Sequence, residues 1–331
     1  MKVNLKVIAE KSGFSISTVS RVVNGSDKIS SGTVDKVLKI ANELGYKPKK
    51  KSAKTVKTKN IALVATGFHK GEFYSSYFHG LNKAALQKNV RLYLASVLDY
   101  KKEIRQLLKN LSTGEFDGVI FLVHELSRPD YEKIASELPA GFPIISNCLI
   151  ENPVFPTITF DSYSGGYLAA QHFREQNYKR AGIISGPSER SESRFRKNGF
   201  IDNLVQFNTI DYVWNCEGDF TFQSGEKAFY DFLKLENKPD AVFASNDEMA
   251  YGFLQTAKVH GYNIPGDVAL ISYDDVPKNQ FTQPQISSVK TDYDKLGSVT
   301  IKAILEQIQK TDLDSNLMSL VPVTISKKET T

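Results

Sequence analysis

The sequence of 331 residues is poor in cysteine, with only Cys148 and Cys216, and its five histidines are scattered along the chain. Two cysteines are too few for a disulfide framework, and neither residue type shows the spacing of metal ligands. No stretch approaches the roughly 18 consecutive apolar residues of a membrane-spanning helix, and the N-terminus lacks the apolar region of a signal peptide. We therefore expect a cytoplasmic protein without a metal ion or a cofactor.

Several motifs of nucleotide-dependent enzymes and hydrolases are absent. No GxGxxG follows an apolar run, and neither GxxxxGK[ST] nor GxSxG occurs in the chain. These absences weaken the interpretation as an enzyme, and we assign no catalytic residue.

Charge is distributed unevenly along the chain, although the overall net charge is only +5. Residues 1–60 contain 14 Lys and Arg against 4 Asp and Glu, a net charge of +10, whereas the remaining residues carry −5. A small basic segment joined to a mildly acidic body is typical of a module that binds a polyanion. The alternative is a basic arm that is merely solvated, so the pattern within the segment has to decide.

Three short helices are predicted in residues 1–46. Gly13 can adopt the positive φ of a tight turn, and Ser15 stands where an N-cap opens a second helix that extends to about Asn24. A third helix ends at Gly45 and Pro48. The apolar stripes are Leu5, Ile8 and Ala9 in the first helix, Val19, Val22 and Val23 in the second, and Val34, Val37, Leu38, Ala41 and Leu44 in the third. This pattern predicts a helix-turn-helix unit.

The outer face of the second helix carries side chains that suit the major groove of DNA. Ile16 can meet a thymine methyl group, and Arg21 can bond guanine or a phosphate. The hydroxyl groups of Ser17 and Ser20 can contact bases or phosphates. The alternative is a small helical bundle with incidental serines, and the net charge of +10 argues against it.

The run Ser15–Gly25 resembles, nearly residue for residue, the VSxxTVSRVLNG signature of the lac-repressor (LacI/GalR) family of bacterial transcription regulators. The match extends to Ala9, Gly13 and the segment 45–48, and the resemblance covers almost the whole chain. It implies a sequence-specific DNA-binding regulator in which Ile16 and Ser17 occupy the two variable base-reading positions. The other DNA-binding positions that the motif implies are Ser15, Thr18, Ser20, Arg21 and Asn24.

Residues 47–60 form a lysine-rich linker with almost no large apolar side chain. Such a segment is predicted to lie along a phosphate backbone and to order poorly without DNA. In the family, a hinge helix at this place inserts a leucine into the minor groove. The nearest match here supplies Ala53, Lys54 and Val56 as DNA contacts. Because Val is smaller than Leu and a weaker helix former, we expect weaker kinking and a larger electrostatic share of the binding.

From residue 61 onward, short apolar runs alternate with longer helical patterns, which predicts parallel sheets with helices on both faces. There are too many such units for one doubly wound domain, so we expect an α/β fold of two lobes, which the resemblance describes as periplasmic-binding-protein-like. The expected lobes are 61–160 with 292–316, and 161–291 with 317–331. Candidate strands are 61–66, 90–96, 118–123, 143–147, 181–186, 240–245 and 268–273, and candidate helices include 74–88, 163–176, 192–207, 225–235 and 247–261.

In such a fold the ligand lies beyond the carboxyl ends of the strands, where loops of this chain carry polar side chains. The resemblance implies that Arg196, Asn246 and Asp274 bind an effector and that Phe220 stacks on it. Phe73 and Tyr74 match the aromatic pair of the first lobe's pocket wall, although Gly71 and Glu72 replace the usual Asn-Pro. The positions that rest on alignment alone are Asn147, Arg190, Glu192 and Tyr293.

These residue types suit a sugar. Arg and Asp can bracket vicinal hydroxyl groups, Asn can both donate and accept, and Phe can cover the apolar face of a pyranose. Taken alone, each charged residue is better explained by a surface salt bridge, and Phe220 by a core position. Four matching positions in four separate strand-end loops favour a pocket. Arg190 leaves a phosphorylated or acidic sugar open as well.

We therefore expect a repressor of sugar-utilisation genes that binds operator DNA as a homodimer. An effector between the lobes would change their angle and so move the two helix-turn-helix units of the dimer relative to DNA half-sites about 34 Å apart. Both an inducer and a corepressor response are open. An α/β enzyme with Asp274 and Arg196 as catalytic groups predicts turnover and leaves the basic segment unexplained. A plain ligand-binding protein predicts a signal peptide and no helix-turn-helix.

Overall fold

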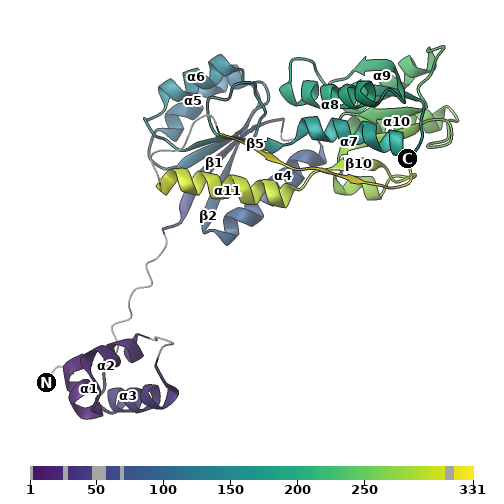
Figure 1. The fold of residues 1–331 in the computed structure, drawn as a ribbon. Coiled ribbons are helices and arrows are strands. Elements are labelled where there is room, and N and C mark those ends of the chain that lie inside the picture. The colour runs from purple at the N-terminus through teal and green to yellow at the C-terminus, as the bar shows by residue number, and fades with distance from the viewer. Residues whose placement is uncertain (1–2, 25–28, 47–56, 68–70, 310–316) are drawn as a thin grey trace. The chain divides into compact units, whose positions relative to one another are not determined.

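The computed structural model describes residues 3–24, 29–46, 57–67, 71–309 and 317–331 (Figure 1). The chain divides into two compact units, Met1–Lys57 and Thr58–Thr331, which we call the head and the body. The linker residues Ala53, Lys54 and Val56 lie outside the described residues, so the expected hinge stays a prediction. In the ranges that the structure describes, no helix combines the length and apolar character needed to cross a membrane.

The head consists of α1 (Leu5–Ser12), α2 (Ile16–Val23) and α3 (Ser31–Glu43), which confirms the predicted helix-turn-helix. Gly13 turns the chain with a φ of +72°, and the Ser15 hydroxyl accepts a 3.1 Å hydrogen bond from the backbone N–H of Thr18. The buried core comprises Ile8, Ala9, Val19, Val22, Val37 and Ala41. The expected apolar stripe of α3 is wrong at Leu38, which is 41% exposed. Leu38 lies about 100° around the helix from the buried Val37, at the edge of the core.

The first lobe of the body contains the strands β1 (Lys59–Thr66), β2 (Val90–Val97), β3 (Gly118–Leu122), β4 (Ile144–Ser146), β5 (Thr157–Phe160) and β11 (Met318–Val321). Its helices are α4 (Glu72–Gln87), α5 (Tyr100–Leu111), α6 (Arg128–Glu137) and α11 (Tyr293–Gln309). The strands form a parallel sheet in the order β11-β5-β4-β3-β1-β2. Apolar side chains of α4 and α11 pack on one face of this sheet, and those of α5 and α6 pack on the other.

The second lobe contains β6 (Arg180–Ser185), β7 (Asp211–Glu217), β8 (Ala241–Ala244), β9 (Ala269–Asp274), β10 (Ser287–Lys290) and β12 (Thr324–Ser326). Its helices are α7 (Ser162–Glu175), α8 (Ser191–Phe207), α9 (Phe222–Leu233) and α10 (Asp247–Val259), with a short 3₁₀ helix η1 (Pro277–Gln280). The strand order is β12-β10-β9-β8-β6-β7, and β12 is antiparallel to its neighbour β10. Helices α7 and α8 cover one face, and α9 and α10 cover the other.

The expected α/β fold of two lobes is therefore confirmed, and each candidate strand and helix is present within a few residues. One lobe boundary was wrong, because β11 pairs with β5 in the first sheet and the chain leaves the first lobe after Val321 rather than at 317. The sequence pattern could not show this, since β11 is a partly exposed strand at the edge of its sheet.

The chain crosses between the lobes after β5, after β10 and after β11. Beside these crossings, one buried apolar cluster continues from Leu63 and Ile120 of the first sheet to Ile183 and Ile271 of the second. A shared apolar core resists separation of the lobes, because separation would expose it to water. The remaining freedom is a change of angle about the crossings.

Helices α7 and α8 cross with almost no space between their backbones. A Cβ atom at Gly166 would lie 1.8 Å from the carbonyl oxygen of Arg196, and one at Gly199 would lie 2.0 Å from that of Tyr163. Only glycine permits this approach. The contact fixes α8, whose N-terminal end faces the first lobe.

We predict that Gly166→Ala lowers the free energy of unfolding of the body by about 2 kcal/mol or more, because the backbone of α8 cannot move aside as a flexible side chain could. Asn198→Ala, at an exposed position of α8, is the matched control and should change stability by less than about 0.5 kcal/mol. Denaturant unfolding measures both variants. Equal stabilities would contradict the close packing.

Candidate functional site

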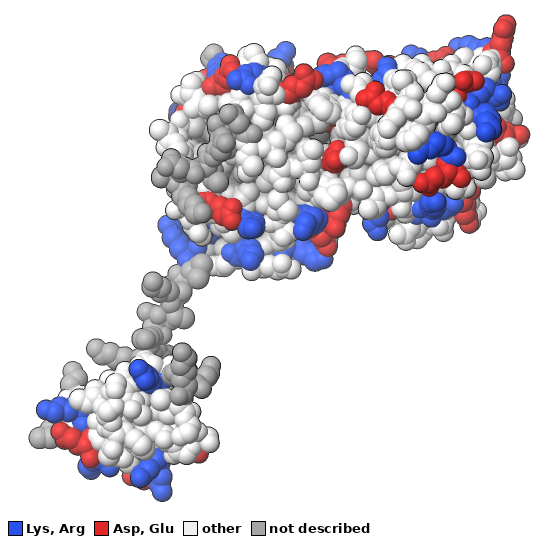
Figure 2. Space-filling model, in the orientation of Figure 1, with Lys and Arg blue, Asp and Glu red and all other residues white. Residues whose placement is uncertain are grey.

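The face of α2 that was predicted to enter DNA is open to solvent. Ile16 is 51% exposed, and Ser17 and Arg21 are exposed as well. Figure 2 shows Lys and Arg side chains at several places on the surface of the head with some Asp and Glu side chains among them, and both signs of charge are mixed over the body as well. The head thus presents short polar and apolar side chains on an exposed helix face, as major-groove recognition requires.

Among the described residues, the remaining predicted DNA contacts are linked to one another by hydrogen bonds along α2. Ser15 caps the start of the helix, and its Oγ lies 2.9 Å from Oγ1 of Thr18. At the other end the side-chain amide of Asn24 donates a 2.5 Å hydrogen bond to the carbonyl oxygen of Ser20. These residues therefore shape the helix that carries Ile16 and Ser17.

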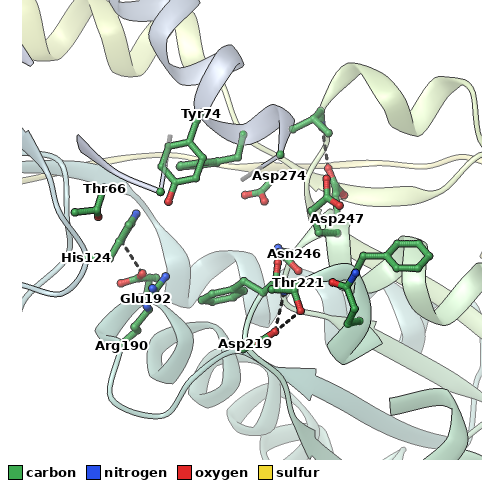
Figure 3. A pocket seen from close by; sticks show the side chains of 18 of the residues that line it. Thr66, Tyr74, His124, Arg190, Glu192, Asp219, Thr221, Asn246, Asp247 and Asp274 are labelled. Carbon is green, nitrogen blue, oxygen red and sulfur yellow. Dashed lines mark hydrogen bonds and ion pairs between the residues drawn. The ribbon is translucent and has the colours of Figure 1, made fainter. Parts of the chain in front are cut away.

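In the body, a cavity of about 390 Å³ lies between the carboxyl-terminal edges of the two sheets. The first lobe lines it with residues that follow β1, β2 and β3 and with the start of α4. The second lobe contributes residues that follow β7 and β8, the end of β9 and the start of α8 (Figure 3). A cavity of this size suits a small-molecule ligand, and it lies where parallel α/β sheets bind one.

Eight of the ten predicted effector residues line this cavity, namely Phe73, Tyr74, Arg190, Glu192, Arg196, Phe220, Asn246 and Asp274. Five different segments of the chain bring them together: the start of α4, the start of α8, and the ends of β7, β8 and β9. Their convergence is what distinguishes a pocket from separate surface residues.

Asn147 and Tyr293 do not line the cavity. Asn147 is buried beside a smaller cavity of about 30 Å³, where its amide donates hydrogen bonds to the carbonyl oxygen of Ile158 and to the Thr300 hydroxyl. Its Oδ1 accepts a hydrogen bond of 2.6 Å from the hydroxyl of Tyr77. Tyr293 packs edge-on against the rings of Phe73 and Phe160. Both residues support the wall of the first lobe from behind, a difference that alignment cannot reveal.

Asp274 ends β9 with its carboxylate buried at the cavity wall. Its Oδ1 has no hydrogen-bond partner among the described residues. Burial raises the pKa of this carboxyl well above its usual range, although Arg196 acts in the opposite direction. The φ of Asp274 is +111°, a conformation that costs energy in any residue other than glycine. A strained residue whose buried carboxyl leaves one oxygen without a partner is a strong indication of ligand binding.

Arg196 and Phe220 form a second part of the wall. The guanidinium of Arg196 lies 3.6 Å from the ring centre of Tyr273 and donates a 2.5 Å hydrogen bond to the carbonyl oxygen of Ser245. Its Nε has no partner among the described residues. The ring of Phe220 lies so close to Gly186 that a Cβ atom there would be 2.1 Å from it. Phe220 is thus held as a flat apolar surface beside a free N–H donor.

Sequence reasoning missed two residues that follow β3 and line the cavity, His124 and Glu125. Nδ1 of His124 lies 2.9 Å from the Glu192 carboxylate (Figure 3), and Arg190 lies 3.5 Å from the carboxylate of Glu125, so both pairs join the two lobes. Their position directly after a predicted strand was the available signal. Nothing in the sequence, however, showed that α8 would face them.

Asp247, the first residue of α10, also lines the cavity but already has its hydrogen bonds. It accepts from the Ser272 hydroxyl, from the side-chain amide of Asn279 at 2.8 Å and from the backbone N–H of Val276 at 2.9 Å. Burial nevertheless raises the pKa of Asp247 to about 6. These bonds connect α10, β9 and η1, so we infer that Asp247 stabilises the shape of the site rather than binding a ligand.

Comparison with known proteins extends these observations to the whole chain. The model of the lacI family of bacterial regulatory proteins matches residues 4–49, and that of a periplasmic binding protein-like domain matches residues 170–331. The HTH-type transcriptional repressor PurR of Photobacterium profundum is 26% identical over 98% of this chain and 97% of its own. The repressor CytR of Escherichia coli is 27% identical over 92% of this chain and 89% of its own. The chain belongs to the lacI family.

Solved structures agree with this assignment. The regulator CelR in complex with cellobiose has a TM-score of 0.74 and 26% identity and covers 100% of both chains. A lac repressor dimer bound to operator and an anti-inducer also has a TM-score of 0.74, with 23% identity over 100% of this chain and 99% of that one. The latter likeness concerns the fold.

Family membership confirms the expectation of a DNA-binding transcription regulator rather than an enzyme, since the relatives are transcriptional repressors. The roles of individual side chains in the head and in the cavity stay predictions. In this lacI-family regulator, the candidates for these roles are the residues on the exposed face of α2 and those that line the cavity.

We predict that Phe220→Ala weakens effector binding about tenfold or more, because the ligand loses a flat apolar wall that is worth at least about 1.5 kcal/mol. Phe281→Ala removes an equal ring that is 82% exposed and does not line the cavity, and it should leave effector affinity unchanged. Calorimetric titration of both variants makes the comparison. A similar loss in both, or in neither, would overturn the assigned role of Phe220.

Proposed function

We propose that this regulator is a cytoplasmic transcriptional repressor of sugar-utilisation genes. In this proposal two copies bind operator DNA through α2, and an uncharged sugar in the interlobe cavity controls their operator affinity. The observation that carries the proposal is the placement of Asp274, Arg196 and Phe220 around one cavity. An acceptor without a donor, a donor without an acceptor and an apolar ring belong to residues that line one cavity.

Sugars supply what these groups lack. A sugar hydroxyl can either donate to the Asp274 carboxyl or accept from it, while a neighbouring hydroxyl accepts from the guanidinium of Arg196. The apolar face of a pyranose or furanose ring covers Phe220, as sugar rings do on aromatic side chains. The similar regulator CelR was solved with cellobiose, which supports a saccharide as the chemical class.

The charge of the cavity wall favours a sugar without a phosphate. Among the described residues its lining carboxylates are Glu125, Glu192, Asp219, Asp247, Glu248 and Asp274, and its basic side chains are His124, Arg190 and Arg196. Each basic side chain already faces a carboxylate or a carbonyl oxygen. An anionic ligand would bring negative charge beside Asp247 and Asp274, the charged forms of which are already disfavoured by burial, so the phosphorylated alternative suggested by Arg190 is the less favourable one.

The proposal of a homodimer rests on the size of one head. A single recognition helix reads only a few base pairs, and two heads on successive half-sites are needed for a specific operator. The lac repressor, which shares the fold, was solved as a dimer on its operator. In the proposed complex Ile16 and Ser17 read bases, and the lysines of residues 47–60 contact phosphates.

We predict that, in fluorescence-polarisation titrations of the full chain, one uncharged sugar changes the affinity for its selected operator at least about fivefold. The operator is first selected from random DNA, and D-glucose, D-ribose and cellobiose are compared with glucose 6-phosphate and ribose 5-phosphate. The phosphate of the active sugar should have less than a tenth of its effect. An effect of phosphates alone, or of no sugar in a wider panel, would contradict the proposal.

Two variants serve as matched controls in this titration. Arg21→Ala should weaken operator binding and leave the thermal shift caused by the sugar intact. Asp274→Asn should keep operator binding and lose the sugar response. The two sites would not be those proposed if either variant abolished both activities while the chain stayed folded.

A further inference from the structure

Three ion pairs join the N-terminal end of α8 to the first lobe. His124 pairs with Glu192 at 2.9 Å, Arg190 with Glu125 at 3.5 Å, and Arg194 with Glu151 at 2.7 Å. In each pair one member belongs to residues 190–194 and the other to a segment that follows β3 or β4. A change of lobe angle that moved α8 away from β3 would break all three together.

We propose that these pairs form an electrostatic latch between the lobes and that His124 takes up a proton from the solvent when the lobes close. This inference rests on the proposed function in one respect, since closure is the motion that the effector is proposed to drive. It adds to that function a regulatory property: closure, and with it the operator response, weakens as the pH rises. The latch itself exists in the chain without effector.

The three pairs differ in their burial, and this difference singles out one of them. The side chains of His124 and Glu192 are only 13% and 12% exposed, whereas those of Arg194 and Glu151 are 38% and 59% exposed. Exposed pairs are screened by salt and contribute little. The His124–Glu192 pair is shielded, and it is the only one of the three that contains a histidine, the side chain that takes up or loses a proton near neutral pH.

The surroundings of His124 favour its charged form. Burial alone would lower the pKa of His124, but the sulfur of Cys148 at 3.7 Å and the Glu192 carboxylate outweigh it, so the pKa is raised well above its usual value. Burial likewise acts to raise the pKa of Glu192, but the neighbouring His124 outweighs burial and lowers this pKa to about 2.

The other lobe and the first lobe both supply titratable or charged groups around His124. These groups are Glu192 and Arg196 of α8, Arg190 before α8, Tyr74 of α4, Cys148 after β4, Asp274 of β9 and the adjacent Glu125.

The direction of the pH effect follows from these contacts. When the lobes part, Glu192 leaves His124 while Cys148 of the same lobe stays beside it, so the pKa of His124 falls to a lower value. The pair then favours closure fully below that value and loses its effect as the pH rises through the higher pKa of the closed form. If the pKa of His124 differs by one between the closed and the open form, the ratio of closed to open molecules changes about tenfold over this pH range.

The first test needs no effector, so its outcome does not depend on the proposed function. Histidine ring signals of the full chain are followed by NMR as a function of pH, and His124→Gln identifies the signal of His124. We expect this signal to titrate well above pH 6.5 in the unaltered chain and to move to lower pH in Glu192→Gln, because that substitution removes the carboxylate that stabilises the charged ring. A titration at or below 6.5 in the unaltered chain, or no change in Glu192→Gln, would overturn the latch.

The second test measures closure itself by pulsed electron paramagnetic resonance. Spin labels are attached through Lys109→Cys in the first lobe and Lys227→Cys in the second, both exposed positions. Cys216, which is partly exposed, is replaced by serine, and the buried Cys148 is retained. Between about pH 6 and about pH 9.5 the share of long distances should increase in the effector-free chain. His124→Gln should give the same distribution at both pH values.

Glu151→Gln is the matched control, because it removes an exposed interlobe pair that contains no histidine. It should shift the distances slightly at both pH values and preserve the difference between them. Distances that do not respond to pH in the unaltered chain, or that respond equally in His124→Gln, would refute the proposal. A pH response in chains that bind no sugar would retain the latch and reject only the proposed effector.

Discussion

The facing carboxyl-terminal edges of two parallel sheets are the constraint on which the site depends. Parallel strands place the loops that follow them on one side of a sheet, and the crossings after β5, β10 and β11 hold two such sides against each other. Polar side chains of Asn246 and Asp274 therefore meet Tyr74 and His124 of the other lobe. Neither lobe alone would complete the cavity, so occupancy of the cavity and the angle between the lobes are coupled.

Two kinds of contact between the lobes have different consequences. The apolar cluster near the crossings is buried and keeps the lobes together. The polar contacts around the cavity consist of a few ion pairs and hydrogen bonds, such as that from the backbone N–H of Lys278 to the carboxylate of Glu72 at 2.9 Å. Contacts of this kind are close to balanced against hydration, so modest ligand interactions are sufficient to change their population.

Much of this could be predicted from local pattern. The turn at Gly13, the cap at Ser15 and the strands that end in polar loops are encoded within a few neighbouring residues, and they fixed the helix-turn-helix, the α/β lobes and eight residues of the cavity. Contacts between distant segments could not be predicted. His124 pairs with Glu192 of the other lobe. Asn147 was predicted from alignment to bind the effector, but it lies inside its own lobe and donates a hydrogen bond to Thr300. Leu38 and the sheet membership of β11 likewise depend on packing.

The central claim is that the cavity and the head are parts of one coupled equilibrium. The most direct test is calorimetric titration of the active sugar into the full chain, with and without saturating operator DNA. Because coupling between two binding sites is reciprocal, operator must change the affinity for the sugar by the factor by which the sugar changes the affinity for operator. The account predicts equal factors. A sugar affinity that is the same with and without operator would contradict it.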